Sequence, residues 1–102
     1  MKLQSNEDKP LLDQVLHNLA RVLYKLGELE ASIKCYQKMG SSNFHSKVGL
    51  ALSSWKAEKF AQAYSAYGEA LQSATTTEQR SHVLAAMATI AFKFQVSSIL
   101  RD

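Results

Sequence analysis

One short pattern recurs three times along this 102-residue chain. A bulky apolar residue and an alanine are followed, four and five places after the alanine, by an aromatic residue and a lysine. The three copies are Leu19-Ala20 with Tyr24-Lys25, Leu50-Ala51 with Trp55-Lys56, and Met87-Ala88 with Phe92-Lys93. The alanines are 31 and 37 residues apart, a mean of 34. A period in this range predicts a stack of small units, each of which buries its apolar face only against its neighbours.

The sequence between these copies repeats as well. Residues 29–39 align without a gap on residues 60–70, and a tyrosine recurs at Tyr36 and Tyr67. Apolar residues before Gly27 recur at three- and four-residue steps, which is the spacing of an amphipathic helix. Each unit therefore predicts two antiparallel helices joined by a short turn.

Turn and capping signals indicate where the helices end. Gly27 predicts a left-handed cap after the first helix, and Thr75 with Glu78 has the spacing of a capping box before the fifth. Residues 1–8 are polar and are predicted to be disordered or frayed. The tail 95–102 is expected either to extend the fifth helix or to begin a sixth. We expect helices near residues 9–26, 28–39, 44–56, 60–73 and 76–94. With one proline and four glycines in the whole chain, the predicted class is all-α.

Taken together, the two halves of the unit resemble the tetratricopeptide repeat (TPR) family. The family has a small residue in its first helix, a glycine at the turn, and a tyrosine in its second helix. The matching positions are Ala20, Ala51 and Ala88, then Gly27, then Tyr36 and Tyr67. The chain departs from the family at the early tryptophan of the first helix, and it lacks the proline near the end of the repeat. In place of the tryptophan it has Leu16, Lys47 and Leu84.

This resemblance implies a TPR-like right-handed superhelix of antiparallel helix pairs over residues 9–102, with about two and a half repeats. The repeats are expected at about 13–43 and 44–76, with a partial one at 77–102. The fifth predicted helix is apolar around most of its circumference, and such a helix expects cover on several sides. We therefore expect a fragment or truncated form of a longer array, which continues into or docks on further helical repeats.

No pattern of catalytic or metal-binding residues stands out in the sequence. The three histidines are far apart, and the one cysteine, Cys35, is expected to be an inert packed thiol rather than a nucleophile. We expect no enzyme activity, no cofactor and no metal. The first residues do not form a signal peptide, and no apolar stretch is long enough for a membrane span. The predicted location is cytoplasmic, and also nuclear as an alternative.

In the TPR family the inner faces of the first helices line a groove that takes a peptide or a partner helix. The resemblance implies the following groove residues: His17, Asn18, Arg21, Tyr24, Lys25, Trp55, Lys56, His82, Phe92 and Lys93. The lysines of the recurring aromatic–lysine pair would meet carboxylates of a partner, and the rings would supply buried area. The alternative is that the rings pack between neighbouring repeats while the lysines are solvated. The lysine and asparagine set with which some TPR domains clamp a terminal carboxylate is absent.

The predicted function is a non-catalytic scaffold segment that binds a protein partner, either a peptide or a subunit, within a multi-subunit complex. A helical-repeat protein associated with RNA is the alternative, either by RNA binding or as a scaffold of a cytoplasmic RNA-decay complex. The repeats also resemble the TPR scaffold family of the superkiller complex, which works with the RNA exosome. Twelve basic and nine acidic residues give a net charge of +3, which is too small to favour RNA by itself.

Overall fold

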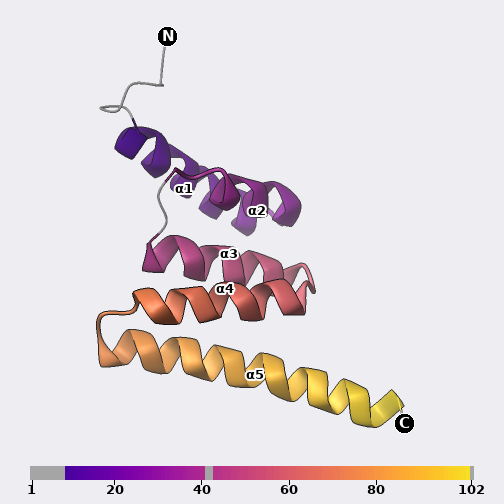
Figure 1. Cartoon of the computed structure of the whole chain (residues 1–102). Coiled ribbons are helices and arrows are strands. Elements are labelled where there is room, and N and C mark those ends of the chain that lie inside the picture. Colours follow the sequence, from indigo (N-terminus) through magenta and orange to yellow (C-terminus); the bar gives the residue numbers. More distant parts are fainter. Residues whose placement is uncertain (1–8, 41–42, 102) are drawn as a thin grey trace.

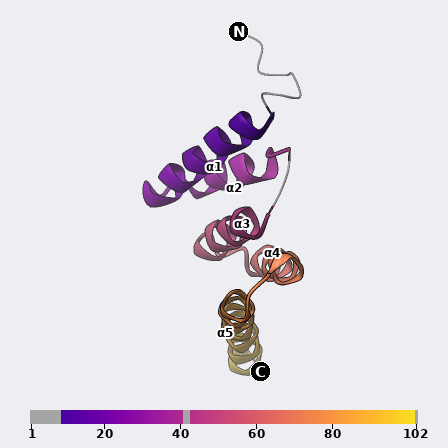
Figure 2. The same ribbon diagram turned by 90° about the vertical axis from the view of Figure 1, so that its left-hand side faces the viewer.

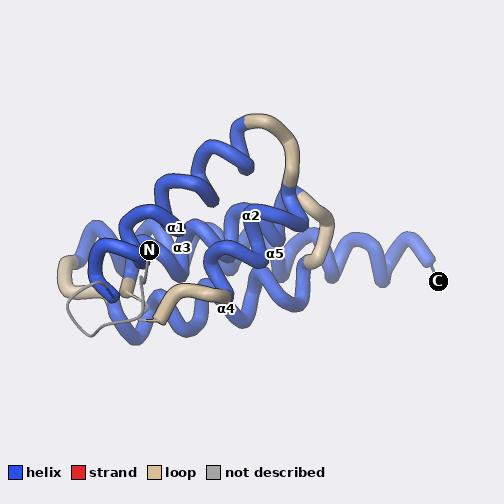
Figure 3. The backbone as a smooth tube through the Cα atoms, turned by 90° about the horizontal axis from the view of Figure 1, so that it is seen from above, coloured by secondary structure: helices blue, strands red, loops and turns tan. Residues whose placement is uncertain are grey.

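The computed structural model describes residues 9–40 and 43–101, and within these ranges the regular structure is entirely α-helical (Figures 1 and 3). The five helices are α1 Lys9–Lys25, α2 Leu29–Gln37, α3 Phe44–Lys56, α4 Phe60–Ser73 and α5 Thr77–Arg101. They fall close to the five predicted ranges, so the predicted all-α class is confirmed. The prediction of disorder at 1–8 lies outside the described residues.

Consecutive helices run antiparallel and stack in one direction (Figure 1). Each helix packs on the one that follows it, and α1 also touches α3 across the shorter α2. Figure 2, turned by 90°, shows the same order, with the helices following one another down the stack from α1 to α5. The molecule is elongated, with extents of 56 × 30 × 17 Å. This is the arrangement of a TPR-like helical repeat, with α1–α2 and α3–α4 as pairs and α5 as a further first helix.

Both turns inside the helix pairs use a residue with left-handed backbone. Gly27 has φ 84°, and Glu58, which lies 31 residues later at the same repeat position, has φ 62°. After each of these residues an N–H reaches back five positions, from Glu28 to the Leu23 carbonyl (2.9 Å) and from Lys59 to the Ser54 carbonyl (2.8 Å). This is the Schellman pattern, which satisfies the last carbonyls of a helix. Glycine adopts this conformation without strain and glutamate does not.

The links between pairs begin the next helix with side-chain caps. Asn43 accepts a hydrogen bond from the Ser46 N–H and its own N–H donates to Ser46 Oγ, both at 2.9 Å. Before α5 the cap is Thr76, whose Oγ1 accepts from the Gln79 N–H at 3.0 Å. The predicted box of Thr75 and Glu78 was therefore wrong by one residue. The Gln79 side chain instead accepts the N–H of Thr75 at 2.8 Å, and this holds Thr75 outside the helix.

Small side chains let the helices approach closely. Ala20, Ala51, Ala63 and Ala70 are fully buried. Ser32 of α2 is also fully buried, and its hydroxyl donates to the Ala20 carbonyl at 2.7 Å. The Ser53 hydroxyl lies 2.9 Å from Ser32 Oγ. Because the single hydrogen of Ser32 is already directed at Ala20, Ser53 is the donor in this second bond. One serine of α2 thus links α1 to α3.

The fifth helix departs from the repeat where the turn is due. Gln95 holds the position of Gly27 and Glu58, 37 residues after Glu58, yet α5 continues through it to Arg101. Of the two predicted alternatives for the tail, helix extension is the one observed over 95–101. Within the described residues no helix follows α5, so Ala88 is exposed although its counterparts Ala20 and Ala51 are buried. The helix projects beyond the ends of α3 and α4 (Figures 1 and 3).

Candidate partner-binding groove

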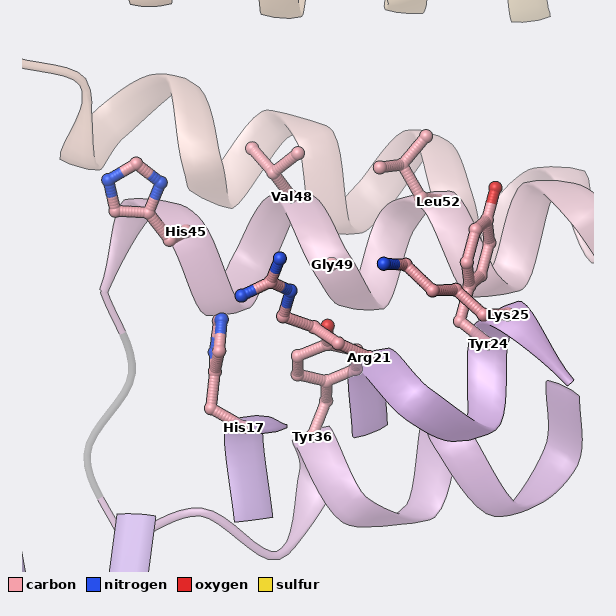
Figure 4. A pocket seen from close by; sticks show the side chains of 9 residues that line it. All are labelled: His17, Arg21, Tyr24, Lys25, Tyr36, His45, Val48, Gly49 and Leu52. Atoms are coloured by element: carbon pink, nitrogen blue, oxygen red, sulfur yellow. The ribbon is translucent and has the colours of Figure 1, made fainter. Parts of the chain in front are cut away.

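A hollow of about 450 Å³ lies between α1 and α3, with α2 beneath it (Figure 4). Arg21 and Lys25 extend from α1 toward α3 across its opening. The residues that line it are His17, Arg21, Tyr24, Lys25, Tyr36, His45, Val48, Gly49 and Leu52. A second hollow of about 470 Å³ shares His17 and His45 with the first and adds Asp13, Gln14, Asn18, Met39 and Asn43. The two hollows form one groove along the inner face of α1.

The main hollow is positive in character. Its lining contains the guanidinium of Arg21, the ammonium of Lys25 and the imidazoles of His17 and His45, and none of the described residues that line it is acidic. Burial lowers the pKa of His17 below its ordinary value, and the nearby Arg21 and His45 lower it further. With its lowered pKa His17 adds little charge of its own, so the preference of the hollow for an anion comes from Arg21 and Lys25. The hollow therefore suits a carboxylate or another anionic group.

A tyrosine from the second helix forms the floor. Tyr36 is buried, and its ring meets the His17 ring edge-on, with centroids 5.6 Å apart. A β-carbon at Gly49 would lie 2.7 Å from Cε1 of Tyr36 and closer still to its hydroxyl end. Gly49 is thus the residue that lets the ring lie between α1 and α3. Burial raises the pKa of Tyr36, which therefore offers a neutral hydroxyl at the base of the groove.

The three aromatic–lysine pairs form a ladder between repeats. The Lys56 ammonium lies over the Tyr24 ring of the preceding repeat, 5.0 Å from its centroid. The Lys93 ammonium lies over the Trp55 ring at 5.2 Å, and over the Phe60 ring at 5.5 Å. Lys56 and Lys93 therefore each contact the aromatic residue of the recurring pair one repeat earlier, at a distance typical of cation–π contacts. Of the three rings, Tyr24 and Trp55 lie between repeats and carry Lys56 and Lys93, whereas Phe92 is 67% exposed.

The predicted groove residues fall into three groups. His17, Arg21, Tyr24 and Lys25 line the main hollow and Asn18 lines the adjoining one. Trp55, Lys56 and Lys93 belong to the ladder. His82 and Phe92 are exposed on α5 and line neither hollow, because the groove lies between α1 and α3. No residue of a second helix was among those predicted for the groove. The signal that would have found Tyr36 is Gly49, a glycine inside a helix where repeat neighbours carry larger residues.

Other chemistry is scarce in the part of the chain that the structure describes. No three His, Cys, Asp or Glu side chains there come together in a way that would hold a metal ion. Cys35 is half-buried on α2. None of the described helices has the length and apolar character needed to cross a membrane.

The stacked helix pairs, the 34-residue mean spacing and the buried small residues define a TPR-like helical-repeat protein. Comparison with known proteins agrees. The chain is 28% identical over 90 residues to Tetratricopeptide repeat protein 37 of Xenopus laevis, which covers 88% of this chain and 6% of that protein. It is 25% identical over 91 residues to Superkiller complex protein 3 of Mus musculus, covering 89% of this chain and 6% of that protein.

The chain thus spans about 6% of the length of these curated relatives. No protein-family profile matches it, and no solved structure matches it either. The likeness to two TPR proteins along nearly the whole chain is what supports the TPR resemblance seen in the sequence.

Proposed function

We propose that this chain is a non-catalytic scaffold segment that binds a protein partner, and that its groove takes an acidic, extended segment of that partner. The observation that carries the proposal is the positive lining of the hollow between α1 and α3. Arg21 and Lys25 come from α1 and His45 from α3, the first helix of the next repeat, so a bound chain would bridge two repeats. The apolar surface of Val48 and Leu52 would take an aliphatic or aromatic side chain beside the acidic ones.

The mechanism requires rigidity rather than chemistry. The Ser32 hydroxyl links to both α1 and α3, and the Tyr36 ring fills the space between them. These contacts fix the distance across the groove before a partner arrives, so little ordering free energy is lost on binding. The cation–π ladder fixes the next repeat in the same way. Such a segment would hold a partner in constant geometry relative to other subunits of an assembly.

Membership in a multi-subunit complex is part of the proposal. One relative is named for the superkiller complex, and the likeness to it covers 89% of this chain. We propose that this chain, like that protein, works within an assembly, in the cytoplasm or also in the nucleus.

A direct test uses an eight-residue peptide of aspartate and glutamate with one central phenylalanine, labelled for fluorescence anisotropy. Its uncharged counterpart has asparagine and glutamine at the acidic positions. The acidic peptide should bind and the uncharged one should bind on the order of tenfold more weakly or worse, because the groove supplies charge complementarity. The double variant Arg21→Gln with Lys25→Gln should lose on the order of tenfold in affinity.

The matched control removes the same charge elsewhere. Lys34→Gln with Lys38→Gln changes two exposed lysines, one on α2 and one at its C-cap, that do not line the hollow, and affinity should be kept within about twofold. Equal losses in both double variants would mean non-specific attraction and would sink the groove proposal. Single-stranded oligouridylate serves as a third probe. If it bound more tightly than the acidic peptide, with a steep salt dependence, the RNA-associated alternative would replace the proposal.

A further inference from the structure

A stripe of large aliphatic side chains lies exposed along α1, and none of them lines either hollow of the groove. We name the following five residues the outer stripe: Leu11, Val15, Leu19, Val22 and Leu26, which are 55%, 54%, 45%, 52% and 71% exposed. Their spacing of four, four, three and four residues keeps them on one side of the helix. A contiguous exposed apolar surface of this kind marks an interaction site.

The repeat register shows what covers this face elsewhere in the molecule. Thirty-one residues after four members of the stripe come Ser46, Leu50 and Ser53 of α3 and Ala57 at its C-cap, and none of these is exposed. α2 covers them, and Ser53 meets Ser32 of α2 at 2.9 Å. Thirty-seven residues further along are Val83, Met87, Ile90 and Phe94 of α5. Val83 and Ile90 are 0% and 1% exposed and belong to the core formed with α4, and Met87 packs against that core, whereas Phe94 is 49% exposed. In α3 and α5, therefore, the preceding second helix covers the face that is bare in α1.

The covering helices share a pattern. α2 carries Ser32, Cys35 and Tyr36, with Met39 just after its end, and α4 carries Ala63, Ala66, Tyr67 and Ala70. If positions are counted from Ser32 and from Ala63, both segments have small residues at the first and fourth positions, a tyrosine at the fifth and an apolar residue at the eighth. The tyrosine of α2 crosses at Gly49, and the equivalent position in α1, 31 residues earlier, is the exposed Asn18. An asparagine amide there would donate a hydrogen bond to a tyrosine hydroxyl.

We propose that the outer stripe of α1 docks an amphipathic helix of a partner that carries this small–small–tyrosine pattern, in the register that α2 adopts on α3. A second copy of the chain is a poorer occupant. Its two described helices with the pattern, α2 and α4, already bury those residues against α3 and α5. The surface that docks this helix meets the groove only at Asn18, which lines the second hollow, and the proposal does not depend on binding of the acidic peptide.

The test measures the register in which the partner helix docks on α1. Since Val22 is the repeat equivalent of Ser53, a cysteine at position 22 should lie beside the partner position equivalent to Ser32. The probe is a synthetic peptide of residues 28–40 with cysteine in place of Ser32, alanine in place of Cys35, and a lactam bridge between the exposed Glu30 and Lys34. The protein is the full chain with Cys35→Ala and Val22→Cys. In a glutathione buffer, mixed disulfide measured by intact mass should form at least tenfold more than with Gln72→Cys, an exposed site on α4.

Two further variants separate docking from simple thiol reactivity. Leu19→Glu, added to the Val22→Cys protein, should remove the enrichment without altering binding of the acidic peptide, because Leu19 is a member of the stripe and does not line the groove. A peptide with alanine in place of Tyr36 should lose most of the enrichment. Equal disulfide yields at positions 22 and 72 would overturn the proposal. A disulfide between two Val22→Cys chains as the dominant product would also overturn it, in favour of a second copy.

Discussion

The ring of Tyr36 occupies the space that a side chain at position 49 would fill, so that α2 reaches the groove only because α3 has a glycine there. A β-carbon at Gly49 would lie 2.7 Å from Cε1 of the ring, well inside ordinary contact distance. Glycine inside a helix costs about 1 kcal/mol relative to alanine. Here that cost is offset by a buried aromatic ring that joins two repeats.

Exchange of this glycine tests the relationship. Gly49→Ala should lower the free energy of unfolding by up to about 2 kcal/mol, because overpacking of about 1–3 kcal/mol exceeds the helix-propensity gain. Gly68→Ala is the matched control, since its β-carbon would meet only Met87 Cε at 3.9 Å. That variant should gain about 0.5–1 kcal/mol. Urea unfolding followed by circular dichroism measures both, and a stabilised Gly49→Ala protein would contradict the assigned role of Tyr36.

The second turn offers a site for stabilisation. Glu58 has φ 62°, the conformation that its repeat equivalent Gly27 adopts freely. Glu58→Gly should raise the free energy of unfolding by about 1 kcal/mol, since left-handed backbone costs a residue with a β-carbon about 1–2 kcal/mol. Gly27→Ala should lower it by a similar amount. Thermal melts of the two variants should shift in opposite directions, and shifts of the same sign would refute this reading of the turns.

The aromatic–lysine ladder predicts energetic coupling between repeats. Lys56 and Tyr24 are 32 residues apart in sequence, with the ammonium 5.0 Å from the ring centroid. A double-mutant cycle with Lys56→Gln and Tyr24→Leu should give a coupling free energy of about 0.5–1 kcal/mol. The same cycle on Lys25 and Tyr24, which are adjacent in sequence and do not form a cation–π contact, serves as the reference. A coupling free energy no larger than in the reference would mean that the contact between Lys56 and Tyr24 does not stabilise the protein.

The groove histidine predicts a pH dependence of stability. The pKa of His17 is lowered below its ordinary value of 6.5, first by burial and then by Arg21 and His45. The folded state therefore binds fewer protons than the unfolded state below about pH 6.5. The His17 contribution to stability is complete above that pH and is lost as the pH falls. His17→Gln should flatten the slope of unfolding free energy between pH 7 and pH 5, and His82→Gln, on exposed α5 surface, should leave it unchanged. Denaturant titrations across this range measure the slopes.

The sequence signals for helix spacing, turns and caps predicted the helices well, because each signal depends only on residues close together in the chain. The spacing of alanines and tyrosines predicted the pairing, and Gly27 predicted the first turn. The cap at Thr76 was missed because three consecutive threonines compete for the position, and the Gln79 side chain decides among them. The break at Glu58 was expected from the repeat, although its left-handed backbone is not favoured by its residue type.

The candidate site was less predictable, since it depends on distances between repeats. The groove residues of α1 were placed by family position, whereas the role of Tyr36 depends on how far α2 sits from α3. The register of the ladder, in which Lys56 meets Tyr24 and Lys93 meets Trp55, depends on how one repeat packs on the next. His82 and Phe92 were grouped with the groove because the repeat gives them equivalent positions, but the hollows of the groove lie at α1 and α3 and contain neither residue.

The most direct test of the scaffold account is a two-dimensional ¹H–¹⁵N NMR titration of the full chain with the acidic peptide. The account predicts chemical-shift changes confined to the groove, at His17, Arg21, Lys25, His45 and Gly49, with the outer stripe and α5 unaffected. The Arg21→Gln and Lys25→Gln double variant should abolish them. Changes centred on α4 and α5, or none at peptide concentrations in the millimolar range, would contradict the claim that this groove binds an acidic partner.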